Sequence, residues 1–371
     1  GKDSAQPRYI HTALSKYTSK IYNKLDNPLY KYINDDGLSV EPVYYVPIIP
    51  VLLVNGSHGI GTGWSTDIPQ YNPLDIIKNI HKFINNEELL DMTPWYKNFK
   101  GTISITGPKT YTSKGKYYID NEKILITELP IGMWTEKYKE FLESITIDSK
   151  KQIGKQGILK YYTSHCTDTD VHFELYFQSE TLEDLIYNNG YNEIEKMFRL
   201  TSNINISNMV YYDRNCKIKK GDNVLDMLVE YCEVRLEFYE KRRLYLIYEI
   251  SKEIKLLKEK IRFILEYIDG ILLINNKRKV EIEDQLETRN YIKVENSYDF
   301  LLRMPIYNLT KDKIEEFTET LKGKNSNLEF LNENNDRSLW KNDLEELEEL
   351  LNKTGYNKKK KIIKKIIKKI S

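Results

Sequence analysis

The sequence predicts an α+β protein with a long helical arm. Residues 1–86 are rich in glycine, proline and tyrosine, and residues 87–212 contain segments in which apolar and polar residues alternate. From Asp213 onward, apolar residues recur every three or four positions. Alternation is typical of half-buried strands and the three-four spacing of helices, so a mixed region precedes a helical one.

In residues 1–86, the run "PVYYVPIIPVLLVNG" predicts extended structure, because Pro42, Pro47 and Pro50 interrupt it. The stretch "NPLDIIKNIHKFI" that follows predicts a helix beginning near Asn72 or Pro73. In the middle region, "GTISITG", "YYIDNEKILITELP" and "DVHFELYF" predict strands. The "DTD" at 168–170 is interpreted as a turn.

The helical region carries an a/d seam over about three heptads, made by Ile247, Ile250, Ile254, Leu257, Ile261, Ile264 and Ile268. A second repeat consists of Trp340, Leu344, Leu347 and Leu351. Between them lies a loop-rich segment that ends in "YDFLLRMPIYNLT". We expect an antiparallel arm with a small apolar head. A helix of about 45 residues from Asp222 would reach roughly 70 Å, so the arm should project.

Composition excludes some classes and leaves others open. The 371 residues allow two or three domains, and 56 basic against 55 acidic residues indicate no partner through net charge. No apolar run approaches the roughly 18 residues of a membrane helix, so no membrane partner is expected. Three widely spaced cysteines suggest a reducing compartment rather than a metal site. The missing initial methionine suggests that upstream sequence is absent.

The last residues, 354–371, form a lysine-rich tail. Its "KKKKIIKKIIKKIS" contains eight lysines and no acidic residue. A solvated helix end or linker is the first interpretation. A nuclear-import patch or a non-specific nucleic-acid contact remains the alternative.

Tyr9 is a candidate nucleophile. A phenol with a reference pKa of about 10 is weakly nucleophilic at neutral pH and needs a cation nearby. Arg8 could grip a phosphate with its planar guanidinium group, and Lys2 could add a second cation. Such a tyrosine can store phosphodiester energy as a phosphotyrosyl ester. As one of 29 tyrosines, Tyr9 would by composition alone be a structural residue.

The second candidate is "NGSHGIGTGW", residues 55–64. It lacks the Lys-Ser/Thr ending of a phosphate-binding loop, so a nucleotide site is not supported. Ile60 lies between glycines. A buried core residue is the usual explanation for such an isoleucine, and a wedge that enters between DNA base steps is the sharper one.

These motifs together resemble the type IIA DNA topoisomerases, in the eukaryotic topoisomerase II branch. "GKDSAQPRYIHTALS" resembles the segment around the active-site tyrosine, and "EPVYYVPIIPVLLVNGSHGIGTGWSTDIPQYNP" resembles the next block. Further blocks follow in the family's order, among them "PWYKNFKGTI", "LITELPIGMWTEKYKE", "SHCTDTDVHFEL", "RLTSNINISNMVYYD", "IRFILEYIDG" and "SLWKNDLEELEELL". The resemblance extends to about residue 353.

The resemblance implies four parts. Residues 1–86 would be a partial winged-helix domain with the catalytic tyrosine, and 87–212 a tower domain. Residues 213–353 would be a coiled-coil arm whose C-gate head lies at about 271–310, followed by the tail at 354–371. The chain would be a fragment of the breakage-reunion core, and a homodimer would form through the coiled-coil gate.

The resemblance also implies residue roles. Tyr9 would attack a 5′-phosphate of double-stranded DNA, and Arg8 would be its transition-state partner. Ile60 would intercalate. The other DNA-binding candidates are Lys2, His58, Gly59 and Gly61. His11 is not assigned as a base. No metal ligand is assigned, since a Toprim module would bind Mg²⁺ and an ATPase module would bind ATP, both outside this sequence.

The implied function is that of an ATP-dependent, nuclear topoisomerase acting in chromosome segregation. It would make a transient double-strand break and pass a second duplex through it, relaxing and decatenating DNA. The alternative is a non-catalytic DNA-binding and dimerisation scaffold with the same fold, which would not need Arg8 and Tyr9. A nucleotide-binding enzyme using the glycine loop would bind free ATP, which we do not expect.

Overall fold

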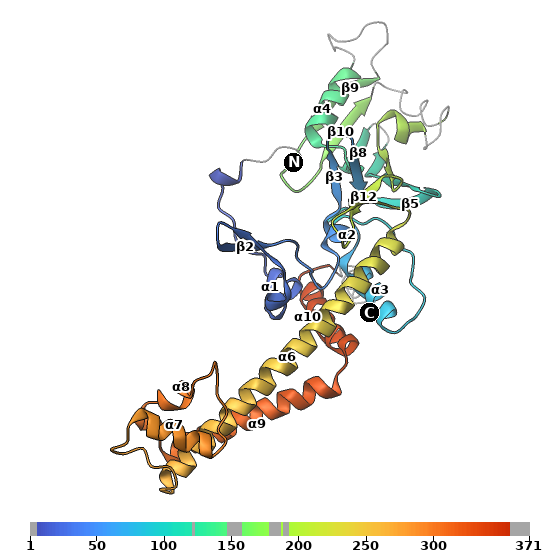
Figure 1. The fold of residues 1–371 in the computed structure, drawn as a ribbon. Coiled ribbons are helices and arrows are strands. Elements are labelled where there is room, and N and C mark those ends of the chain that lie inside the picture. The colour runs from blue at the N-terminus through green and yellow to red at the C-terminus, as the bar shows by residue number, and fades with distance from the viewer. Residues whose placement is uncertain (1–5, 121–122, 147–157, 178–186, 188–192, 357–371) are drawn as a thin grey trace, which may run out of the picture. The chain divides into compact units, whose positions relative to one another are not determined.

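The computed structural model describes residues 6–120, 123–146, 158–177, 187 and 193–356 (Figure 1). Two compact units share the chain. The first comprises Gly1–Tyr22, Pro47–Val234 and Leu344–Ser371, and the second comprises Asn23–Val46 and Arg235–Asp343. Helices and strands alternate through the first unit and helices dominate the second, which confirms the predicted α+β class. The expected domain boundaries at 86, 212 and 353 stay predictions.

The strands described in the first unit pair antiparallel. A four-stranded sheet has the order β7 (Lys116–Asp120), β8 (Lys123–Glu128), β10 (Phe173–Phe177), β9 (Leu159–Ser164). A three-stranded sheet has the order β11 (Thr201–Asn205), β6 (Thr110–Lys114), β5 (Thr102–Gly107). Two hairpins complete the set: β3 (Ser57–Ile60) with β4 (Ser65–Ile68), and β12 (Met209–Tyr212) with β13 (Ile218–Gly221). Strands therefore form where the alternating segments predicted them.

The core of the first unit lies between the four-stranded sheet and helix α4 (Thr135–Ser144). Alternate residues of β8 and β10 are fully buried, and Phe173 of β10 lies with its ring 5.2 Å from that of Tyr138 on α4. The Tyr138 hydroxyl donates to the Phe198 carbonyl at 2.9 Å, so this buried polar group is satisfied.

Helix α3 (Pro73–Ile84) confirms the predicted start. The Asn72 side chain accepts a hydrogen bond from the Leu74 amide at 3.0 Å and so caps the helix, while Pro73 occupies its first turn. Ile76, Ile77 and Ile80 recur at helical spacing and are buried.

The extended structure predicted for the proline-rich run is wrong at its end. Val51–Asn55 forms a short helix, α2, directly after Pro50. In so short an apolar run, the spacing of the side chains does not distinguish a helix from a strand. A proline just before the first turn is also compatible with either structure. Further short elements are η1 (Pro7–Tyr9), α1 (Thr18–Ile21), η2 (Lys24–Leu29), β1 (Tyr32–Asp35) and β2 (Leu38–Pro42).

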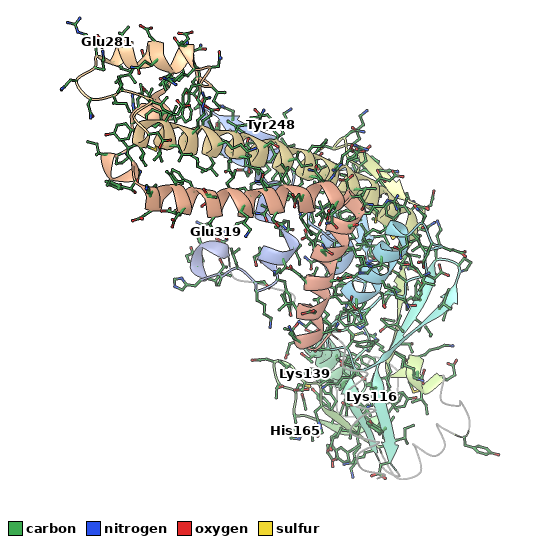
Figure 2. The ribbon with its side chains drawn as sticks, turned by 90° about the horizontal axis from the view of Figure 1, so that it is seen from below. Lys116, Lys139, His165, Tyr248, Glu281 and Glu319 are labelled. Atoms are coloured by element: carbon green, nitrogen blue, oxygen red, sulfur yellow. The ribbon has the colours of Figure 1, made fainter. Side chains whose placement is uncertain are left out.

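Helix α6 (Val224–Ile268) has 45 residues, as the sequence predicted, and contributes to both units. Within the second unit, helix α9 (Lys311–Glu333) lies alongside it in both views, with Tyr248 marking α6 and Glu319 marking α9 (Figure 2). The Lys324 ammonium lies 2.6 Å from Glu253, and Arg243 lies 2.7 Å from Asp336 at the start of α10 (Asp336–Lys353). The earlier residue of α6 pairs with the later partner and the later residue with the earlier partner. This order confirms the antiparallel pairing.

The segment between α6 and α9 contains α7 (Lys279–Thr288), α8 (Asp299–Leu302) and η3 (Ile306–Asn308). These elements surround an apolar cluster of Phe263, Leu272, Ile282, Leu286, Tyr291, Tyr298 and Leu301. The apolar head expected from the sequence therefore exists. None of the described helices is both long and apolar enough to cross a bilayer.

The second unit also contains a buried ionic cluster. The Asp26 carboxylate accepts from Arg235 Nη1 at 2.8 Å and from Arg242 Nε and Nη2, each at 2.7 Å. Arg242 Nη1 and the Tyr239 hydroxyl both donate to Asp343 at 2.7 Å. Asp26, Arg235 and Arg242 are buried, so the charges compensate one another in place of water.

Candidate functional site

Arg8 and Tyr9 lie on the surface of the first unit, in the single turn η1. The Tyr9 amide donates to the Gln6 carbonyl at 2.9 Å, which closes the turn. The Tyr9 side chain is 75% exposed, and the Arg8 guanidinium carbon lies 5.6 Å from the centre of its ring. In the part of the chain that the structure describes, neither side chain makes a hydrogen bond or an ion pair. Both polar groups are therefore available to a ligand.

This arrangement fits the chemistry that the sequence predicted for the pair. An exposed phenol can be reached by a phosphodiester, and an adjacent guanidinium without a carboxylate partner can bind the phosphate oxygens. Lys2 lies outside the described residues. His11 is exposed, two residues beyond Tyr9.

Ile60 ends strand β3 at the tip of the β3–β4 hairpin. Its register partner is Ser65, and the Gly61 amide donates to the Trp64 carbonyl at 2.7 Å to close the tip. Ile60 is 89% exposed, so the common explanation of a buried core isoleucine does not apply. An apolar side chain held on a hairpin tip in water has the geometry of a wedge.

The glycines of this hairpin fall into two kinds. Gly56 and Gly63 have positive φ angles of 67° and 78°, and a Cβ at Gly56 would lie 2.6 Å from the Ile68 carbonyl oxygen. These two are required by the backbone. A Cβ at Gly59 would meet nothing within 4 Å, and one at Gly61 would have only an ordinary contact with the Trp64 carbonyl. Nothing in the described fold therefore requires glycine on either side of Ile60.

His58 lies across the hairpin from Asp67, with its Nδ1 atom 3.4 Å from the carboxylate. Both side chains are exposed. The contact is long, and it leaves the imidazole accessible on the same hairpin as Ile60.

The β12–β13 hairpin lies beside the Ile60 hairpin. The Thr66 hydroxyl donates to the Val210 carbonyl at 2.7 Å and accepts from its amide at 3.1 Å. Asn208 donates to Ser65, and its carbonyl accepts from the Asp67 amide at 2.8 Å. An open groove of about 520 Å³ lies between the hairpins, lined among others by Leu52, Ile60, Trp64, Tyr211, Tyr212 and Ile218.

Sequence reasoning did not find Thr66 and Asn208. They lie more than 140 positions apart, and nothing in the pattern around either residue indicates the other. The structure joins neither of them to Tyr9: among the described residues, no hydrogen bond or ion pair links the Arg8–Tyr9 turn to the Ile60 hairpin.

No group of three or more His, Cys, Asp or Glu side chains in the described residues is arranged to hold a metal ion. The "DTD" segment is a turn between β9 and β10, as predicted, in which the Thr167 amide donates to the Asp170 carbonyl at 2.9 Å. A hydrogen bond from Lys100 at 2.5 Å holds the pKa of Asp170 below its usual range. Asp170 therefore pairs with Lys100.

Comparison with known proteins gives consistent results. The model of the family described as the A subunit of DNA gyrase/topoisomerase IV matches residues 1–345. The chain is 38% identical to DNA topoisomerase 2 of Plasmodium falciparum over 95% of its own length and 27% of that protein. It is 37% identical to the mitochondrial DNA topoisomerase 2 of Dictyostelium discoideum over 98% of the chain and 28% of that protein. The chain thus spans about a quarter of the length of these relatives.

A solved structure is also similar. The crystal structure of the Plasmodium falciparum topoisomerase II DNA-binding, cleavage and re-ligation domain matches with a TM-score of 0.83 and 38% identity. The match covers 95% of this chain and 50% of that one. Both the order of the sequence motifs and the three-dimensional arrangement are therefore shared.

Proposed function

Because the chain belongs to the family of the DNA gyrase and topoisomerase IV A subunits, we propose that it is part of the DNA breakage-reunion core of a eukaryotic-type, ATP-dependent type IIA topoisomerase. The observation that carries this proposal is the exposed Tyr9 phenol beside the Arg8 guanidinium, which has no carboxylate partner among the described residues. A non-catalytic scaffold would have no need of such a pair.

In the proposed reaction, Tyr9 Oη attacks a backbone phosphate of double-stranded DNA in line with the 3′ oxygen. The bond between phosphorus and that oxygen breaks as the phosphotyrosyl bond to the 5′ end forms. The proton lost by the phenol balances the one gained by the 3′ hydroxyl. Arg8 stabilises the negative charge that develops on the phosphate oxygens. Religation reverses these steps and needs no external energy.

Ile60 is proposed to enter between base steps of the same duplex and to bend it. Unstacking costs a few kcal/mol, and a smooth bend costs about 1–6 kcal/mol, which new contacts offset. Lys2, His58, Gly59 and Gly61 are proposed to lie along the DNA. The open space around both glycines supports a close approach of the hairpin to the duplex.

Mg²⁺ and ATP are proposed to act through parts outside this chain. The described residues do not fit a metal, since they contain no suitable group of ligands. The Toprim and ATPase modules would supply these sites, and no step above depends on a metal ligand from this chain. Relaxation and decatenation, which need both modules, are proposed for the complete enzyme.

A homodimer is proposed to form through the apolar head of the second unit. Ile306 and Tyr307 are 84% and 76% exposed, and Val280 and Leu273 are also exposed nearby in the sequence. Apolar side chains gathered on a surface mark an interaction site, and a second copy would cover them. The proposed domains are those expected from the sequence: a partial winged helix at 1–86, a tower at 87–212 and the arm with its gate at 213–353.

The nucleus is the proposed compartment, because a topoisomerase of this branch would act on chromosomes during segregation. The Dictyostelium relative is named as mitochondrial. Fractionation of cells with an antibody to the complete protein tests the assignment, and recovery of the protein in mitochondria alone would contradict it.

The test of function combines the chain with the Toprim and ATPase modules, supercoiled DNA and Mg²⁺, followed by denaturation. We expect protein covalently attached to 5′ ends with wild-type protein and none with Tyr9→Phe. Equal adduct from both proteins would overturn the catalytic proposal. DNA binding without any adduct in either protein would favour the scaffold.

A further inference from the structure

We propose that strand β12 is a buttress for the Ile60 hairpin, and that Thr66 and Asn208 are positioning residues that hold Ile60 in place for insertion. The inference rests on the proposed function in one respect, namely that Ile60 enters DNA. It adds two residues for which neither the sequence motifs nor the family comparison gives a role.

The hairpin needs support from outside itself. Strands β3 and β4 have four residues each, and a two-stranded hairpin of this length is marginally stable on its own in water. Ile60 and its flanking glycines are exposed, and a Cβ added at Gly59 would meet no described atom within 4 Å. A wedge that pushes bases apart experiences an equal push in return, so an unsupported tip would be displaced before the stack opened.

The support lies directly opposite the wedge. In the hairpin register Ile60 pairs with Ser65, and Gly59 pairs with Thr66. Asn208 Nδ2 donates to the Ser65 hydroxyl at 2.9 Å and to its carbonyl at 3.2 Å. The side-chain contacts between β4 and the segment Asn208–Val210 therefore fall on the two residues of β4 that face the wedge and its neighbour. A backbone hydrogen bond from the Asp67 amide to the Asn208 carbonyl adds to them.

Thr66 makes an unusual bridge between the two hairpins. Strands β4 and β12 belong to separate sheets, yet one hydroxyl satisfies both the amide and the carbonyl of Val210. At this point the Thr66 side chain makes the hydrogen bonds to Val210 that a neighbouring strand's backbone would make within a sheet. Valine at position 66 would keep the shape and lose both hydrogen bonds.

The buttress is itself anchored. Met209 of β12 is fully buried, and the Tyr211 hydroxyl donates to Glu230 of α6 at 2.6 Å. Lys219 of β13 donates to the same carboxylate at 2.9 Å. A continuous set of contacts therefore runs from Ile60 through β4 and β12 to the first turns of α6.

The experiment measures DNA bending and DNA affinity separately. The chain is mixed with a duplex of about 30 base pairs labelled at both ends for energy transfer, and binding is followed by anisotropy. Thr66→Val and Asn208→Leu are close in shape to the natural residues, and they lose the side-chain hydrogen bonds to Val210 and to Ser65 respectively. We expect each to lose at least about half of the bend signal, while affinity, which depends mainly on phosphate contacts, changes by less than about twofold.

Two controls separate positioning from folding. Thr66→Ser keeps the hydroxyl and should bend DNA as the wild type does. Thr110→Val makes the same chemical change on β6, where Thr110 donates to Asn205 at 3.2 Å, and it should have no effect on bending. Melting curves confirm that each variant is folded, and if Thr66→Val does not fold, Asn208→Leu decides the question.

The failure of this inference differs from the failure of the proposed function. Ile60→Ala should abolish most of the bend, and a wild-type bend in that variant would contradict the wedge itself. If Ile60→Ala loses the bend but folded Thr66→Val and Asn208→Leu keep it, the wedge stands and the buttress is wrong. An equal loss in Thr110→Val would also overturn the buttress, because the effect would then not be specific to β12.

Discussion

Two regions of this molecule combine arginine with tyrosine, and they differ in almost every other respect. In the first unit Arg8 lies 5.6 Å from the ring of an exposed Tyr9, and neither has a charged partner in the described chain. In the second unit Arg235 and Arg242 lie 4.3 and 4.4 Å from the ring of Tyr239. There the arginines bind Asp26, and the Tyr239 hydroxyl donates to Asp343.

The difference shows that the surroundings of a tyrosine, and not the residue type, decide what its hydroxyl group can contact. Burial raises the pKa of Tyr239, and its hydroxyl joins α6 to α10 through the hydrogen bond to Asp343. Such a phenol cannot reach a phosphate. Tyr9 has the same phenol group, and no described residue competes for it by a hydrogen bond.

Tyr9→Phe should reduce covalent DNA adduct by roughly 10³-fold or more, because it removes the attacking oxygen. Tyr239→Phe is the matched control and should form adduct at the wild-type rate. Adduct is measured by gel after denaturation, in the presence of the Toprim and ATPase modules. Loss of adduct in the folded Tyr239→Phe protein would mean that the buried pair takes part in the reaction.

Asp26→Asn should destabilise the chain by about 3–5 kcal/mol, since it removes the charge partner of the buried Arg235 and one of the two carboxylates that bind Arg242. Glu253→Gln, which removes an exposed ion pair with Lys324, should cost at most about 1 kcal/mol. Urea unfolding followed by circular dichroism measures both. Similar losses for the two variants would show that burial does not distinguish the ionic cluster from a surface pair.

Arg8→Ala should slow cleavage by about 10²–10³-fold, which corresponds to about 2.7–4 kcal/mol of transition-state stabilisation. Its effect on unfolding should stay within about 0.5 kcal/mol, because the side chain is exposed. Single-turnover cleavage and a melting curve check the two halves of the prediction. Arg8→Lys keeps the charge without the planar fork and should lie between wild type and alanine.

Tyr239→Phe should lower stability by about 1–2 kcal/mol through loss of the hydrogen bond to Asp343. Arg242 still donates to that carboxylate, so the loss should be smaller than for Asp26→Asn. Urea unfolding gives the value. A loss as large as that of Asp26→Asn would show that the hydroxyl, and not the ion pairs, organises the cluster.

Local patterns predicted much of the fold. The cap at Asn72, the strands of the middle region and the 45-residue helix α6 each depend on neighbouring residues, so their periodicity was visible in the sequence. The helix at Val51–Asn55 was not visible, since an apolar run of that length fits either period.

Long-range contacts escaped prediction because no local pattern encodes them. Asp26 meets Arg235 across 209 positions, and Thr66 meets Val210 across 144. The exposure of Tyr9 and Ile60 likewise depends on what the rest of the chain leaves uncovered. The resemblance of the motifs pointed to Tyr9 and Ile60. Thr66 and Asn208, which contact each other's segments beside Ile60, became visible only in the structure. Lys2 and residues 357–371 of the lysine-rich tail lie outside the described residues.

The empty space beside Gly59 has a consequence for anyone who engineers this protein for heat resistance. Alanine there would meet no atom within 4 Å and would restrict the unfolded chain, so a gain of about 0.4–1 kcal/mol is expected. The added methyl group would nevertheless thicken the hairpin at the point where it would enter a groove. Alanine at position 59 would then raise the thermal stability of the chain and weaken the insertion of the hairpin into DNA.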